Sequence, residues 1–192
     1  MPETPEQLHA RAAGALRTPP VNEWDTWPFD GEIRPKRLEP LTPEPAIEGQ
    51  DGVGCRACGK PDSEYLWVNE RWRLTSLGEP SGLPVVVLLE PREHYAGPAD
   101  LPPELACEQG VMLGRVERAV LAVGGIARVH IGRWGEGAEH LHWWFIARPE
   151  GFGQLLSSMA EIWDEVLPLT PREVWQGNLE RVVAALEHDG AA

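Results

Sequence analysis

The sequence predicts one α+β domain: an antiparallel sheet of about five strands with packed helices, an N-terminal arm and additional C-terminal helices. Five strand-like runs fall within residues 65–148, and one long helical stripe separates the first three from the last two. A length of 192 residues is enough for one such domain with extensions. We expect an N-terminal extension at residues 1–53, the domain at 54–150 and C-terminal helices at 151–192.

The N-terminal extension combines a short helix with a proline-rich arm. Residues 5–16 predict the helix, because Leu8 and Leu16 lie on one helical stripe. Seven prolines between residues 18 and 50 fix the backbone and remove amide donors, so regular structure is not expected there. Trp24 and Phe29 are too apolar for a free linker, and we expect the arm to lie across the domain surface.

The domain itself begins near Gly54. Residues 65–69 and 72–76 predict a hairpin, and the β-branched run at residues 84–90 predicts a buried central strand. The main helix begins at about Pro102 and runs to the glycines at 124 and 125. The last two strands are expected to pair antiparallel, at residues 127–133 and 138–148, on either side of a glycine-containing loop.

Two helices are expected after the sheet. The first covers residues 152–166. The second begins at the capping box Thr170-Pro171-Arg172-Glu173, which has proline at the first helical position.

Composition limits the partners. The net charge of −13 and the pI of about 4.9 argue against nucleic acid and anionic membranes, which repel an acidic surface. The N-terminus has neither a basic start nor an apolar run, and the longest apolar run, at residues 85–89, is too short to span a bilayer. Three cysteines are too few for a disulfide scaffold. We therefore expect a cytoplasmic protein.

Two histidines in the last strand are the strongest chemical signal. Strand alternation places His140 and His142 on one face and Glu139 on the other. The small, flexible loop at residues 134–138 precedes them and would let an anion approach the backbone. The pair therefore predicts a nucleophile or a metal site. A metal pair would need His130 or Glu139 as a further ligand, and two hydrogen-bonded core histidines are the alternative.

The order of these parts resembles the histidine triad (HIT) superfamily. The resemblance spans residues 54–149: a Cys-x-x-Cys turn, a hairpin, an apolar strand ending in Pro91-x-x-His94, a long helix, a glycine loop and a His-x-His strand. The hallmark of that family is His-x-His-x-His followed by two apolar residues. Here the same frame reads Ala138-x-His140-x-His142, so the first histidine is missing. The resemblance also implies a homodimer and a nucleotide as the small-molecule ligand.

In this frame the resemblance implies that His140 attacks the α-phosphate of a nucleotide and that His142 assists the phosphate or the leaving group. Backbone amides around Gly135 and Gly137, with the charge of Arg133, are expected to hold the phosphate. The implied function is a nucleotide hydrolase or nucleotidyl transferase, such as a phosphoramidase or dinucleoside polyphosphate hydrolase. The alternative is a nucleotide-binding or interaction module of the same fold with weak or no catalysis.

Three residues are candidate nucleotide contacts. Trp67 and Leu74 would line a cleft for the base, although core positions are the alternative for both. Glu79 lies in the turn where relatives place an acid that binds ribose hydroxyls.

Cys55 and Cys58 form half of a four-ligand structural zinc site, and the reaction itself requires no cofactor. In zinc-bearing relatives two histidines complete the site, but those places here hold Ala138 and residues 82–84. His94, His130 and Cys107 are the candidate replacements if the fold brings them close. The alternative is a knuckle turn without a metal.

Overall fold

A five-stranded antiparallel sheet forms the centre of the protein. The computed structural model describes residues 3–17, 20–156 and 158–189. The strands lie in the order β1-β2-β3-β5-β4, and every neighbouring pair is antiparallel. The predicted α+β fold is therefore confirmed. The strand bounds are Trp67–Val68 (β1), Trp72–Ser76 (β2), Val86–Pro91 (β3), Ile126–Gly132 (β4) and Trp143–Pro149 (β5).

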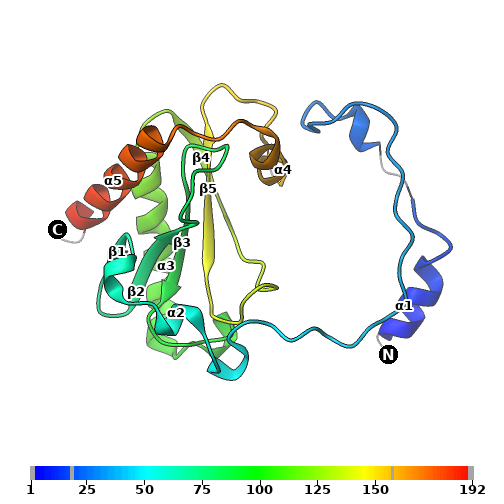
Figure 1. The fold of residues 1–192 in the computed structure, drawn as a ribbon, viewed down its shortest axis with the longest axis horizontal. Coiled ribbons are helices and arrows are strands. Elements are labelled where there is room, and N and C mark those ends of the chain that lie inside the picture. The colour runs from blue at the N-terminus through cyan, green and yellow to red at the C-terminus, as the bar shows by residue number, and fades with distance from the viewer. Residues whose placement is uncertain (1–2, 18–19, 157, 190–192) are drawn as a thin grey trace.

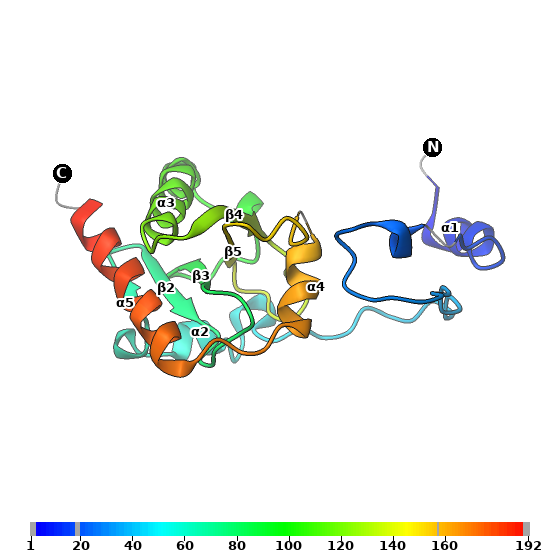
Figure 2. The same cartoon turned by 90° about the horizontal axis from the view of Figure 1, so that it is seen from above.

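Two helices cover one face of the sheet. They are α3 (Pro103–Leu121) and α5 (Arg172–Asp189), and Figures 1 and 2 show both away from α4. Leu74 of β2 pairs with Leu89 of β3, and both are fully buried beneath these helices. Phe145 of β5 and Val116 of α3 belong to the same cluster. This face holds the main core, and its close packing keeps the central strands rigid.

A smaller cluster covers part of the opposite face. Val86 and Ile146 pair across β3 and β5 and pack with Leu155 and Ala160. The helix α4 (Met159–Val166) carries Ala160 and lies over this part of the sheet. Residues 152–156 form turns and not the start of a helix, so α4 is shorter than the sequence predicted.

The contact of α4 with the β2–β3 connection requires glycine at position 82. A Cβ atom there would lie 2.7 Å from the backbone oxygen of Asp164 and 2.7 Å from Cβ of Leu167. The neighbouring amide of Leu83 donates to Oδ1 of Asp164 at 2.8 Å. The close approach and this hydrogen bond together hold α4 against the sheet.

Gly82→Ala is expected to lower the free energy of unfolding by about 1–3 kcal/mol, because the added methyl group forces α4 outward. Gly177→Ala in α5 is the matched control, since a Cβ there meets nothing within 4 Å. Alanine favours a helix by about 0.5–1 kcal/mol over glycine, so the control should stabilise the protein. Urea unfolding of both variants measures the difference. A Gly82→Ala protein as stable as the wild type would contradict this description of the contact.

The N-terminal arm extends away from the sheet (Figures 1 and 2). Its helix α1 (Pro5–Ala12) begins at a capping box made by Thr4 and Gln7 and ends earlier than expected. The arm meets the domain where the indole of Trp163 donates to the backbone oxygen of Thr26 at 2.8 Å. It returns through a parallel bridge between Glu48 and Ala138. Leu8, Leu16, Trp24 and Phe29 are exposed, so these four side chains do not carry the expected packing across the domain surface. The end of the arm, near residues 48–52, makes further contacts with the domain.

Among the described residues, no helix combines the length and the apolar character that crossing a lipid bilayer requires.

Candidate functional site

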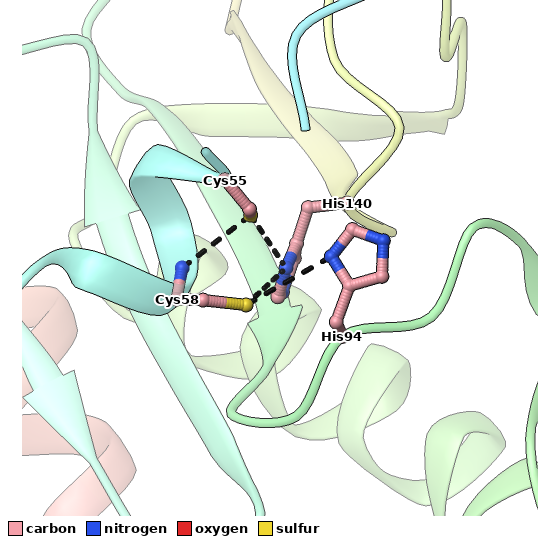
Figure 3. Close-up of side chains that lie close together, drawn as sticks. All are labelled: Cys55, Cys58, His94 and His140. Carbon is pink, nitrogen blue, oxygen red and sulfur yellow. Dashed lines mark hydrogen bonds between the residues drawn. The ribbon is translucent and has the colours of Figure 1, made fainter. Parts of the chain in front are cut away.

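Two thiols and two imidazoles meet beside the sheet. They belong to Cys55, Cys58, His94 and His140, and their ligand atoms all lie within 4.8 Å of one another. Figure 3 shows these side chains turned toward a common centre. The cysteines come from the turn before β1, His94 follows the end of β3, and His140 precedes β5. Residues 85 positions apart in the chain therefore form one cluster.

The cysteine turn brings both sulfurs to the same side. Its single helical turn, α2, covers Arg56–Gly59, and the sulfur of Cys55 accepts from the amide of Cys58 at 3.5 Å. Gly49, with φ of 77°, passes so close that a Cβ atom would lie 3.2 Å from Cβ of Cys55. A side chain at position 49 would therefore push the turn away from the cluster.

His140 is buried, with 3% of its surface exposed. Its Nε2 lies 2.9 Å from the backbone oxygen of Pro91, and because a carbonyl only accepts, Nε2 carries the proton. The lone pair is then on Nδ1, which lies 3.4 Å from the sulfur of Cys55 and 3.5 Å from that of Cys58. Burial lowers the pKa of His140, which favours the neutral ring.

This geometry is inconsistent with the nucleophilic role that the sequence predicted for His140. A nucleophile needs a free lone pair that faces the substrate, but both ring nitrogens of His140 have protein partners. The segment before β5 is also not a strand, because the amide of Leu141 donates to Tyr95 and not to β3. His140 and His142 therefore lie in the segment before β5 and not within the strand that the sequence predicted.

Of the three replacement ligands considered, only His94 joins the cysteines. Its Nδ1 lies 3.8 Å from the sulfur of Cys58. His130 lies in the middle of β4, and Cys107 is exposed on α3. The fourth ligand-type group is His140, which the sequence reasoning missed because it had assigned that histidine to catalysis. Within the described residues His142 belongs to no such cluster, so the alternative of a His140–His142 metal pair is not supported.

His142 differs from His140 in its surroundings. It is half-buried, and its Nδ1 lies 2.8 Å from the backbone oxygen of His140. That carbonyl accepts the Nδ1 proton, which leaves the lone pair on Nε2. The ring lies edge-on to Trp144, with centroids 6.2 Å apart. Trp143, the next residue, faces the other way and donates from its indole to Gln109 of α3 at 3.0 Å.

The predicted phosphate-binding residues lie in the loop between β4 and His140. Arg133 donates to the backbone oxygen of Ala96 at 2.7 Å. Its guanidinium also lies over Gly135, where a Cβ atom would be 2.9 Å from Nη2. Gly135 has φ of 69°, whereas a Cβ on Gly137 would meet nothing within 4 Å. The phosphate role of these three residues stays a prediction.

The predicted nucleotide contacts are not brought together. Leu74 is fully buried on the sheet face under α3 and α5, and Trp67 packs against the same cluster. Both therefore fit the core alternative, since Trp144 packs on the opposite face of the sheet. Glu79 is exposed in the β2–β3 connection and forms an ion pair with Arg172. We do not assign the three residues to one pocket.

A cleft between the sheet and α4 has lining residues that the sequence did not predict as a group. It has a volume of about 290 Å³, and Trp144, Trp134 and Leu77 are among its lining residues. The two indoles meet edge to face, with centroids 6.0 Å apart. Glu161 of α4 also lines the cleft, and burial raises the pKa of its carboxyl group. The signal available in the sequence was the group of aromatic side chains at residues 134–144, in which Trp144 stands two positions after His142.

The fold is that of the histidine triad proteins. No protein-family model matches the sequence, and no curated protein matches it at a significant level. Solved structures, however, match over 65–71% of this chain, and the predicted resemblance is confirmed at the level of the fold.

One similar structure is a hypothetical histidine triad nucleotide-binding protein from Sulfolobus tokodaii, with a TM-score of 0.53 and 15% identity over 70% of this chain and 93% of that one. A zinc-bound histidine triad family protein from Mycobacterium smegmatis has a TM-score of 0.51 and 20% identity, over 71% and 93% of the two chains. A histidine triad protein from Bradyrhizobium japonicum has a TM-score of 0.51 and 20% identity, over 65% and 87%.

Proposed function

We propose that this protein is a nucleotide hydrolase or nucleotidyl transferase in which His142 attacks the α-phosphate. The observation that carries the proposal is the hydrogen bond from Nδ1 of His142 to the backbone oxygen of His140, at 2.8 Å. This bond fixes the ring and leaves a basic lone pair on Nε2. A neutral imidazole with a fixed tautomer is a competent nucleophile near pH 7.

The family hallmark supports the same assignment when its frame is moved by two residues. His140 then occupies the first histidine position, His142 the middle one and Trp144 the third. The middle histidine is the nucleophile of the family that this chain resembles. In this frame the missing histidine is the third one, and the first histidine has a clear role in the cluster with the cysteines.

We further propose that Cys55, Cys58, His94 and His140 hold a structural zinc ion. Two thiols and two imidazoles are a common donor set for zinc, and ligand atoms around a tetrahedral zinc lie about 3.3–3.8 Å apart. The sulfur–nitrogen distances of 3.4, 3.5 and 3.8 Å fall near this range. When bound, the ion would supply a closed, four-ligand cross-link and no open position for substrate. His140 would thereby hold its own backbone oxygen in place against His142.

The chemistry proceeds in two displacements. Nε2 of His142 forms a bond to the α-phosphorus while the bond from phosphorus to the leaving group breaks, and the leaving group takes a proton from solvent water. Water or another acceptor then forms a bond to the phosphorus, the histidine–phosphorus bond breaks, and the nucleotide is released. The loop amides near Gly135 and Gly137 and the charge of Arg133 would stabilise the phosphoryl oxygens.

The base of the nucleotide would lie in the 290 Å³ cleft that Trp144 lines, since the ring of Trp144 also meets that of His142 edge-on. Nucleobases stack on aromatic faces, and Trp134 and Trp144 offer two such faces.

We also propose a cytoplasmic location and a homodimer. The support for a dimer is that β4, in the described part of the chain, is a terminal strand whose outer edge pairs with no other strand.

The test is incubation of the purified protein with adenosine and guanosine phosphoramidates and dinucleoside polyphosphates. We expect release of the nucleoside monophosphate and, after rapid denaturation in alkali, a nucleotide attached to the protein through histidine. Binding without release in the whole panel would contradict the enzymatic proposal. It would favour the alternative, a nucleotide-binding module of the same fold.

One observation favours that alternative. Trp144 occupies the third position of the motif, and an indole N–H donates hydrogen bonds but does not ionise at neutral pH, so it cannot act as a general acid. Its Nε1 is buried and has no partner among the described residues. The site would then lack an acid at this position to protonate the leaving group.

A further inference from the structure

We propose that Glu139 is a positioning residue for the cluster of Cys55, Cys58, His94 and His140. Glu139 orients the ring of His94 through Nε2, the ring nitrogen that faces away from the cysteines. The inference rests on the proposed zinc site and adds a residue to its surroundings. Oε1 of Glu139 lies 3.3 Å from Nε2 of His94. A carboxylate only accepts, so Nε2 of His94 carries the proton and the lone pair is on Nδ1, toward Cys58.

Glu139 is itself held in place by the end of the N-terminal arm. Its backbone amide donates to the backbone oxygen of Glu48 at 2.9 Å. Its Oε1 also accepts from the amide of Asp51 at 2.7 Å. The side chain is only 18% exposed. These two hydrogen bonds fix Glu139 independently of His94. The carboxylate can therefore determine the orientation of the histidine ring.

The ring of His94 is enclosed on its other sides. It meets the ring of His140 edge-on, with centroids 5.3 Å apart. Gly52, with φ of 78°, passes close enough that a Cβ atom would lie 3.7 Å from Cδ2 of His94. Because Glu139 also binds the amide of Asp51, the same carboxylate positions both the ring and the turn that packs against it.

Strand alternation had placed Glu139 on the face away from the histidines. The alternation fails because residues 139–142 are not part of β5, whose first residue is Trp143. The backbone there pairs with Glu48 and Tyr95, which turns Glu139 toward the cluster. Loss of a carboxylate that orients a ligating histidine typically weakens metal binding about 10–100-fold.

The experiment is a zinc competition titration of the full chain against a chromophoric chelator. We expect Glu139→Ala to bind zinc about 10–100-fold more weakly than the wild type, and Glu139→Gln to fall between them because its amide oxygen still accepts. Glu136→Gln is the matched control, since it removes the same charge from an exposed position three residues away. Glu139→Ala with wild-type affinity would overturn the inference.

A second measurement separates orientation from general loss of structure. Two-bond proton–nitrogen spectra of the zinc-loaded wild type should show His94 with its proton on Nε2 and slow exchange of that proton. Glu139→Gln should keep the fold but exchange this proton faster. Unchanged exchange in Glu139→Gln, with unchanged affinity, would also overturn the inference. A wild-type protein that takes up no zinc would instead contradict the proposed metal site itself.

Discussion

Replacement of His142 by glycine is expected to lower turnover of a nucleotide substrate by at least about a thousandfold, because it removes the attacking nitrogen. Zinc content and circular dichroism should match the wild type, since His142 lies outside the cysteine cluster. Added imidazole should restore part of the activity by occupying the vacated space. The measurement is the steady-state release of nucleoside monophosphate, with and without imidazole.

His140→Gly provides the comparison. This change removes a buried side chain whose Nδ1 lies 3.4 Å from the sulfur of Cys55, so zinc content and stability should fall along with activity. Imidazole is not expected to restore turnover in His140→Gly, because the loss of His140 would also disrupt the cysteine cluster and with it the position of His142. If His142→Gly kept full activity while His140→Gly lost activity at normal zinc content, the nucleophile would be His140 and our assignment would be wrong.

Removal of the metal is expected to produce the largest change in stability. A ligand that binds only the folded state at a thousandfold excess over its Kd stabilises it by about 4 kcal/mol. For a chain of this size that corresponds to about 8–16 °C in Tm. Cys55→Ser, or treatment with a strong chelator, should lower Tm by this amount. Cys107→Ser is the control and should leave Tm unchanged, because Cys107 is exposed on α3 outside the cluster.

The same centre should respond to pH. Burial, helped by the neighbouring Cys55, raises the pKa of Cys58 to about 11 in the metal-free protein. The thiol therefore holds its proton at neutral pH, and the proton must leave when a metal binds. Each unit of pH decrease should weaken zinc binding about tenfold through Cys58 alone. Stabilisation by zinc should thus rise from pH 6 to pH 8, and a pH-independent Tm difference would contradict this account.

The fold could be predicted from the sequence because each strand carries its own signal. The β-branched run that becomes β3 and the helical stripe that becomes α3 need no distant partner to be recognised. The ends were less predictable. The segment from Glu139 to His142 looks like strand from its alternation, but its backbone bonds to Glu48 and Tyr95 depend on tertiary contacts.

The site was predicted only in part for a related reason. A three-histidine motif with one histidine missing fits this sequence in two frames, and local pattern does not choose between them. The choice depends on the contact between His140 and the cysteines, 85 positions earlier. Trp67 and Leu74 were predicted as base contacts only because of their residue types. The pairing register of the strands, which the sequence alone does not give, places Leu74 beneath the helices.

The separation of the four cluster residues along the chain has a further consequence. Cys55 and His140 enclose most of the domain between them, and the three cysteines are free thiols. Closing a loop of that length by a cross-link removes about 4–5 kcal/mol worth of conformational entropy from the unfolded chain, on the chain-entropy estimate used for disulfides. A metal ion here would therefore cross-link the segments that precede β1 and β5 as a disulfide bond would, without requiring the thiols to be oxidised.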